Sequence, residues 1–152
     1  QRKKDLLLHM LAPITRAVSL DIKNILKNSN LGLLVVELLR NAEVSPEGAV
    51  AIKELVDQVA QLLLDPEIAD GNASHRTYRR LLNISKPLRK ACSKVIRDAS
   101  QEQVQELLQS KGVWILVTLV TKRKKLAPLI ASHKAMIPTD HKGGEELIKL
   151  LI

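Results

Sequence analysis

The feature that most constrains this chain is a stripe of apolar residues within residues 52–63. Counted from the first of them, the six residues lie at i, i+3, i+4, i+7, i+10 and i+11; they are Ile52, Leu55, Val56, Val59, Leu62 and Leu63. Because an α-helix completes a turn every 3.6 residues, this spacing places all six side chains on one side of a helix. Ser45-Pro46-Glu47 before the stripe and Asp65-Pro66 after it predict where this helix begins and ends.

The remaining segments repeat this helical pattern. Apolar residues make up 45% of the 152, and they are almost all Leu, Ile, Val and Ala, with one Tyr, one Trp and no Phe. Such a composition favours helix. Serines at positions 74, 85 and 100 are predicted to cap three further helices, and Pro128 to kink a helix that spans 126–137. Helices are also predicted at 3–11, 13–27 and 145–152, and a loop is predicted at 65–73.

Two apolar runs, residues 31–39 and 112–120, are ambiguous. Their length and β-branched residues would also suit buried strands. We predict helices for both, because every neighbouring segment has the helical period and the sequence shows no hairpin signal.

Four short, strongly apolar segments have similar openings. They begin at Asn30-Leu31-Gly32, Ser74-His75, Lys111-Gly112 and Lys142-Gly143-Gly144, roughly 44, 37 and 31 residues apart. Helical units that recur at about this period predict an all-α fold, an α-solenoid. A chain of this length is sufficient for one continuous core, so a single domain is expected. The opening Gln1 and the uncapped end suggest a fragment of a longer protein.

Charge is distributed unevenly along the chain. Residues 1–70 contain eight Lys/Arg and ten Asp/Glu, whereas residues 71–152 contain sixteen and six, which gives the net charge of +8. This asymmetry indicates a polyanionic partner, with nucleic acid first and an anionic membrane surface second. No apolar run reaches the eighteen or so residues of a membrane span.

The densest positive charge lies in residues 74–97, which contain no acid. Arginines at i, i+3 and i+4 share one helix face, and five cations share a face of the next helix. Many long cations without a neighbouring acid suit phosphate neutralisation, and a solvated helix face is the alternative. The predicted contacts are Arg76, Arg79, Arg80, Lys86, Arg89, Lys90, Lys94 and Arg97.

A second basic cluster is formed by Lys122, Arg123, Lys124 and Lys125. It suits phosphate contact, a nuclear or nucleolar targeting signal, or cations at the C-terminal end of a helix, where the helix dipole favours them. These alternatives stay open at the level of sequence.

No residue pattern indicates catalysis, a metal or another cofactor. The four histidines form no i, i+4 pair and have no neighbouring cysteine, which leaves zinc unsupported. Cys92 lies on an apolar stripe, and as the single cysteine it excludes a disulfide framework and suits a reducing compartment. Tyr78 suits core packing better than base stacking, and Trp114 is predicted to lie in the core. We therefore expect no enzyme and no small-molecule substrate.

Five segments carry a further pattern: residues 2–13, 30–39, 74–82 and 110–119, and Ala135-Met136-Ile137-Pro138 followed by Gly144-Glu145-Glu146-Leu147-Ile148. In these segments the chain resembles the C-terminal Puf-like (CPL) region of the nucleolar Puf-A branch of the Pumilio family. The resemblance implies an α-solenoid of Puf-like or HEAT-like repeats, stacked as three-helix units, and binding of RNA or DNA with little sequence preference. It also implies a role with ribosome-assembly proteins in large-subunit biogenesis and rRNA processing, in the nucleus and nucleolus.

One departure from the family narrows this expectation. Base-reading Pumilio repeats use paired polar side chains and a stacking residue on the second helix of each repeat. The corresponding helix starts here offer Leu31, Gly32, Gly112 and Gly143, which have no side chain that can hydrogen-bond a base. Recognition of the phosphate backbone is therefore favoured.

The alternative from another class is a helical-repeat scaffold whose groove takes a peptide or a ribosomal protein. The acids of the first half favour it, because Glu37, Glu43, Glu47, Glu54 and Asp57 would repel phosphate. A membrane-surface role comes third, since no helix combines exposed bulky apolar residues with a basic face.

Overall fold

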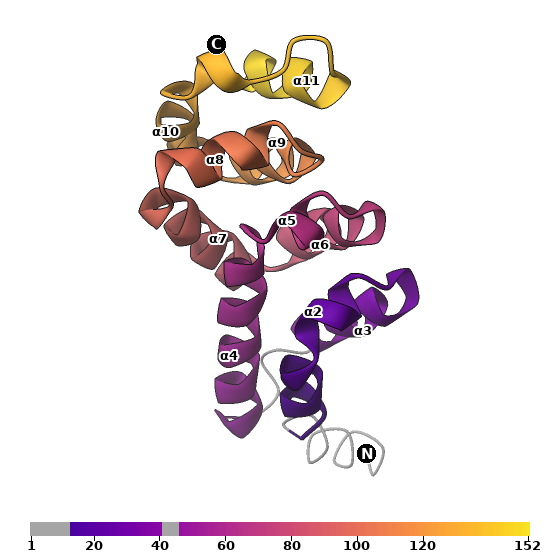
Figure 1. The fold of residues 1–152 in the computed structure, drawn as a ribbon. Coiled ribbons are helices and arrows are strands. Elements are labelled where there is room, and N and C mark those ends of the chain that lie inside the picture. Colours follow the sequence, from indigo (N-terminus) through magenta and orange to yellow (C-terminus); the bar gives the residue numbers. More distant parts are fainter. Residues whose placement is uncertain (1–12, 41–45) are drawn as a thin grey trace.

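The fold is all-α. The computed structural model describes residues 13–40 and 46–152, which contain helices and turns and no strand (Figure 1). Both ambiguous apolar runs are helical, as α3 (Ser29–Arg40) and α9 (Val113–Lys122), and this confirms their prediction. The predicted helix at 3–11 and the predicted cap Ser45 lie outside the described residues.

A helical segment at residues 13–20 precedes α2 (Ile22–Leu26). After α3 come the seventeen-residue α4 (Pro46–Leu62), the short α5 (Pro66–Ala69), and two longer helices, α6 (Asn72–Ile84) and α7 (Lys86–Asp98). The C-terminal part contains α8 (Gln101–Leu108), α9, η1 (Lys124–Leu126), α10 (Ala127–Ala131), η2 (Lys134–Met136) and α11 (Lys142–Leu151).

The longer helices form two adjoining sets. In one set α3 packs against α6, α6 against α9, and α9 against α11, so that these four helices form a row. In the other set α4 packs against α7, which also contacts α6 and α9. The short helix α5 contacts α6 and α8, and α8 contacts α9. In Figure 1 α4 stands upright beside α2 and α3, and the later helices lie above them, up to the yellow α11 at the top.

One continuous core runs through the stack. It draws fully buried residues from α2, α4, α6 and α9, among them Leu26, Leu55, Leu81 and Leu116. The stripe on α4 is part of it: five of its six residues are buried and Leu62 is half-buried. Removing this apolar surface from water is the main favourable contribution to folding.

Two glycines permit close packing within the row. A Cβ at Gly32 would lie 2.6 Å from Oγ1 of Thr77, where α3 meets α6. A Cβ at Gly143 would lie 2.8 Å from Cγ1 of Val113, where α11 meets α9. The glycines that open the apolar segments therefore have a packing role, because a side chain would separate neighbouring helices.

Serine caps fix two of the helix starts as predicted. Ser85 Oγ accepts a hydrogen bond from the N–H of Leu88 at the start of α7. Ser100 and Gln103 form a reciprocal capping box at the start of α8. Ser85 is also the C-cap of α6, so α6 and α7 are joined through a single residue.

The predicted loop at 65–73 is wrong. Asp65 caps α5 by accepting from the N–H of Glu67, and Pro66 occupies the first turn. Ser74 is not a cap, because α6 already begins after Gly71 and Ser74 Oγ donates to the Ile68 carbonyl at 2.5 Å. The sequence did contain a start signal for α5, namely Asp65-Pro66-Glu67.

Two other predicted helices are interrupted. The helix expected over 13–27 is divided at Asp21, which is a turn residue. The kinked helix expected over 126–137 is replaced by η1, α10 and η2, with Pro128 in the first turn of α10. A proline at that position begins a helix, because its missing N–H would have no partner there.

Candidate nucleic-acid interface

We call Arg76, Arg79 and Arg80 of α6 the arginine face. Arg76 and Arg80 are exposed and one turn apart. Together with Gly32 and Leu33 of α3 they line a small depression of about 130 Å³ between α3 and α6. The row therefore presents these two guanidinium groups at a junction of neighbouring helices.

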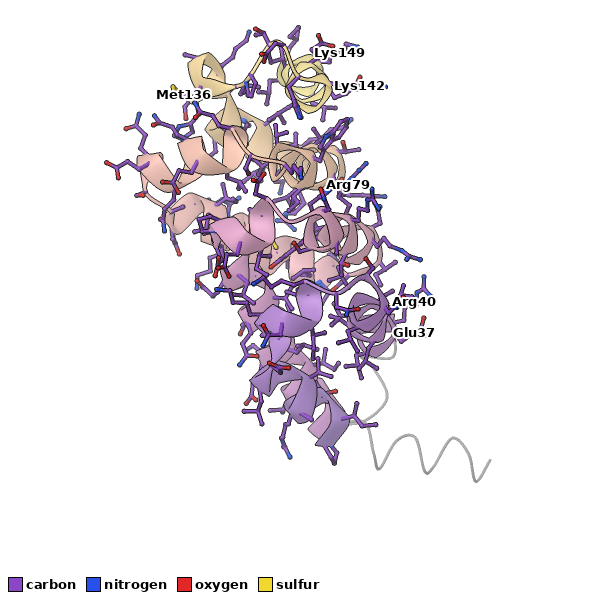
Figure 2. All side chains as sticks on the ribbon, turned by 45° about the vertical axis from the view of Figure 1, so that its right-hand side comes forward. Glu37, Arg40, Arg79, Met136, Lys142 and Lys149 are labelled. Carbon is purple, nitrogen blue, oxygen red and sulfur yellow. The ribbon has the colours of Figure 1, made fainter. Side chains whose placement is uncertain are left out.

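Arg79 lies on the part of the arginine face that is turned towards α9, over the ring of Trp114. Its Cζ atom is 5.1 Å from the ring centroid, which is cation–π geometry. The Trp114 ring is half-buried, and its centroid is 6.5 Å from that of His141. Trp114 thus packs against the core, in line with the prediction, but the core does not fully enclose it. Figure 2 shows Arg79 on the same side of the molecule as Arg40 and Lys142.

The arginine face is electrostatically unopposed. Within residues 13–40 and 46–152, none of its three guanidinium groups has an ion-pair partner. Its positive potential acts on His75, whose pKa is lowered first by burial and then by Arg76 and Arg79. A surface of this kind attracts anions.

The cations of α7 lie on a different surface. Lys86, Lys90 and Lys94 follow one another at i, i+4 and i+8, and all three are exposed. They line one wall of a groove of about 900 Å³ whose other wall is α4, and we call it the lysine groove. The two predicted basic faces therefore line different hollows, one between α3 and α6 and the other between α4 and α7. The hollows adjoin at the end of α6, where Arg80 of the first and Ile84 of the second are one turn apart.

Arg89 and Arg97 differ from these lysines. Arg89 is half-buried, and its Nη1 donates to the carbonyl oxygens of Leu82 at 2.7 Å and Asn83 at 3.5 Å. It thus satisfies carbonyl groups that the end of α6 leaves without a helical partner. Arg97 is exposed in the last turn of α7, where a cation complements the helix dipole.

The second basic cluster occupies the junction after α9. Lys122 is the last residue of α9, Arg123 is its C-cap, and Lys124 and Lys125 lie in η1. Three of the four are exposed and Arg123 is half-buried. This position suits the helix dipole and leaves the lysines accessible to an anionic ligand.

The single tyrosine and the single cysteine are structural. Tyr78 is fully buried, and its hydroxyl donates to the Val59 carbonyl of α4. Cys92 is also fully buried, and burial raises its pKa to about 12. Both predictions of a core position are confirmed, so neither side chain is available to a base or a metal.

The sequence indicated the cations but not the lysine groove. Its apolar residues come from four helices: the ends of α3 and α6, the length of α4, and Pro87 and Ala91 of α7. The charges of α7 do not reveal these apolar residues. The spacing of the α7 lysines at i, i+4 and i+8 indicates only that the lysines share one side of the helix.

Two further observations concern the kind of site. Among the described residues, no group of three or more His, Cys, Asp or Glu side chains has a geometry that could hold a metal ion. In the same residues no helix has both the length and the apolar content that a bilayer crossing requires.

Comparisons with protein-family models, curated proteins and solved structures give no match to this chain. The resemblance to the CPL region therefore stays a prediction that rests on the quoted segments.

Proposed function

We propose that this chain is an RNA- or DNA-binding module that contacts the phosphate backbone through the arginine face, with little sequence preference. The observation that carries the proposal is the position of Arg76 and Arg80, which are exposed, one turn apart and without an ion-pair partner in the described residues. Guanidinium groups bind phosphate oxygens through paired hydrogen bonds, which suits Arg better than Lys for this contact.

The proposed architecture behind this surface is a short α-solenoid of Puf-like three-helix repeats. It is supported by the row of α3, α6, α9 and α11, whose first three members begin at Ser29, Asn72 and Val113. In such a stack one helix of each unit contributes to a shared surface. We regard the whole chain as one helical-repeat domain.

Backbone binding is favoured over base reading by the residues of the row. Gly32 and Gly143 are buried in helix contacts and offer no side chain to a base. Tyr78 is fully buried and cannot stack on a base. The remaining candidate groups are the cations, which contact phosphate without regard to sequence.

The cellular role follows from the resemblance alone. A CPL-like module would act in a nucleolar factor for large-ribosomal-subunit biogenesis and rRNA processing, with structured rRNA as its ligand. Lys122, Lys124 and Lys125, at the junction after α9, are further exposed cations that such an RNA could contact.

The experiment that tests this function is a salt titration of a labelled RNA duplex. We expect the wild-type affinity to fall steeply with salt concentration, because each phosphate contact releases counterions. In an Arg76→Gln/Arg79→Gln/Arg80→Gln variant, the slope of log K against log[salt] is expected to shrink by roughly 2–3.

The matched control is Lys86→Gln/Lys90→Gln/Lys94→Gln, which removes the same number of charges from α7. It is expected to keep most of the wild-type slope. Undetectable or salt-insensitive binding by the wild-type chain would contradict the proposed function.

A further inference from the structure

The lysine groove has an apolar floor. Ile52 and Val56 of α4 and Leu39 of α3 line it and are almost fully buried, at 5%, 3% and 6% exposure. Ile84, at the end of α6, also lines the groove and is 39% exposed. The groove therefore offers an apolar ligand side chain a surface that is open at Ile84 and backed by the core.

The rim of the groove is strongly basic. Lys53 stands on the α4 side and three lysines stand on the α7 side, and Arg40 lies at the end of α3. Asp57 is the one acid among the lining residues described. Arg40 is engaged by Glu37 at 3.0 Å, whereas the four lysines have no ion-pair partner in the residues that the structure describes. Charge complementarity thus calls for an acidic ligand.

The spacing on α7 indicates the shape of that ligand. Lys86, Lys90 and Lys94 are four residues apart, which is about 6 Å of helix rise for each step. Carboxylates at i, i+4 and i+8 on a second helix have the same spacing. A helix laid along α7 could therefore pair its acids with the lysines and turn its apolar side chains towards Ile84 and Val56.

We infer that the lysine groove binds an acidic amphipathic helix of a partner protein. The observations that carry this are the apolar floor, the unpaired lysine rim and the matching helical spacing. A phosphate backbone fits less well, because it has no apolar side chain to bury against the floor. This inference goes beyond the proposed nucleic-acid contact and uses the neighbouring groove.

The test screens a yeast-display library of ~20-residue helical peptides for binding to the complete 152-residue chain. The peptides are randomised at the positions that face outward from the helix. We expect the enriched peptides to carry Glu or Asp at i and i+4 together with Leu, Ile or Phe on the adjoining face. Replacing their acids by Gln, or their apolar residues by Ser, is expected to weaken binding at least about tenfold.

Variants of the chain locate the binding surface. Lys86→Glu/Lys90→Glu/Lys94→Glu is expected to lower the affinity of the enriched peptides at least about tenfold, and Ile84→Ser about fivefold. The matched control for Ile84→Ser is Leu150→Ser, because Leu150 is similarly exposed, at 38%, and lies on α11. Circular dichroism establishes that each variant keeps its helical content.

Three results would overturn the inference. The first is a library selection that yields no binder. The second is a set of binders whose affinity the α7 and Ile84 variants leave unchanged. The third is loss of RNA binding in the α7 variant to the same extent as in the α6 variant, which would assign the groove to nucleic acid. Loss of RNA binding by the α6 variant alone tests only the proposed function.

Discussion

The arginine face and the lysine groove belong to consecutive helices and carry the same sign of charge, yet they differ in their surroundings. Arg79 is held against the Trp114 ring, and Arg76 and Arg80 border a depression of only about 130 Å³. The lysines border a groove of about 900 Å³ with a floor of apolar side chains. The number of cations therefore does not define the ligand of a surface. The side chains beside the cations also select it, because a ligand must fit an apolar floor in one place and an aromatic ring in the other.

The chemistry of the two kinds of cation strengthens this difference. Guanidinium groups form paired, planar hydrogen bonds with phosphate and stack on aromatic rings. Ammonium groups are compact charges on flexible stems and tolerate varied carboxylate geometry. Arginines on one surface and lysines on the other are therefore consistent with two ligands.

The largest expected effect comes from reversing charge on one surface at a time. Arg76→Glu/Arg79→Glu/Arg80→Glu is expected to lower the affinity for an RNA duplex about 100-fold or more at low salt, since it removes contacts and adds repulsion. Lys86→Glu/Lys90→Glu/Lys94→Glu changes the net charge equally and is expected to lower it less than about tenfold. Fluorescence anisotropy measures both affinities. Equal losses would contradict the assignment of RNA to the arginine face.

A second prediction separates a structural cation from the ligand-binding ones. Arg89→Ala is expected to lower the free energy of unfolding by about 1–2 kcal/mol, because the Leu82 carbonyl loses a charged donor. The exposed neighbour Lys90→Ala is expected to stay within about 0.5 kcal/mol of wild type. Urea denaturation followed by circular dichroism gives both values, and equal stability of the two variants would contradict the capping role of Arg89.

A third prediction uses Trp114, the single tryptophan, as a reporter. Because Arg79 covers its ring, an RNA duplex that engages Arg79 is expected to change Trp114 emission by tens of per cent. An acidic helix in the lysine groove is expected to leave the emission nearly unchanged. Titrations with both ligands test this, and in Arg79→Ala the response to RNA is expected to be lost.

The smallest expected effect is on the titration of His75. Its pKa lies below 6.5 because of burial first, and then because of Arg76, Arg79 and Lys111, while Asp70 opposes them. RNA phosphates on the arginine face would reduce the repulsion and raise this pKa, whereas a groove ligand would not. NMR titration of the imidazole protons measures the change, and the same rise with an acidic peptide would contradict the separation of the surfaces.

The sign of the associated stability change follows from the lowered pKa. Above pH 6.5 His75 is neutral in both the folded and the unfolded chain. As the pH falls below that value, the unfolded chain takes up a proton more readily, so the folded state loses stability down to the folded pKa. His75→Gln is expected to flatten this part of the stability profile.

Helices and most of their starts could be predicted from the sequence, because the signals are local. The apolar stripes of α4 and α7 and the caps Ser85 and Ser100 each depend on residues within one or two turns. Errors arose where short signals competed, as at α5, where Asp65 and Pro66 suited both a loop and a new helix.

The surfaces could be predicted only in part. The exposure of Arg76 and Lys90 follows from the helical period. The stacking of Arg79 on Trp114 and the capping of α6 by Arg89 depend on how neighbouring helices meet. The groove depends on four helices at once, α3, α4, α6 and α7, and no short stretch of sequence encodes it.

Ser85 gives the two surfaces a fixed relation. It ends α6 and begins α7, and no further residue intervenes that could absorb a change of angle. A nucleic acid bound on α6 and a protein helix bound beside α7 would therefore have one fixed orientation relative to each other. Because Ile84 and Ser85 also line the lysine groove, glycines inserted at this joint are expected to weaken the groove ligand as well as to free the alignment of the two ligands.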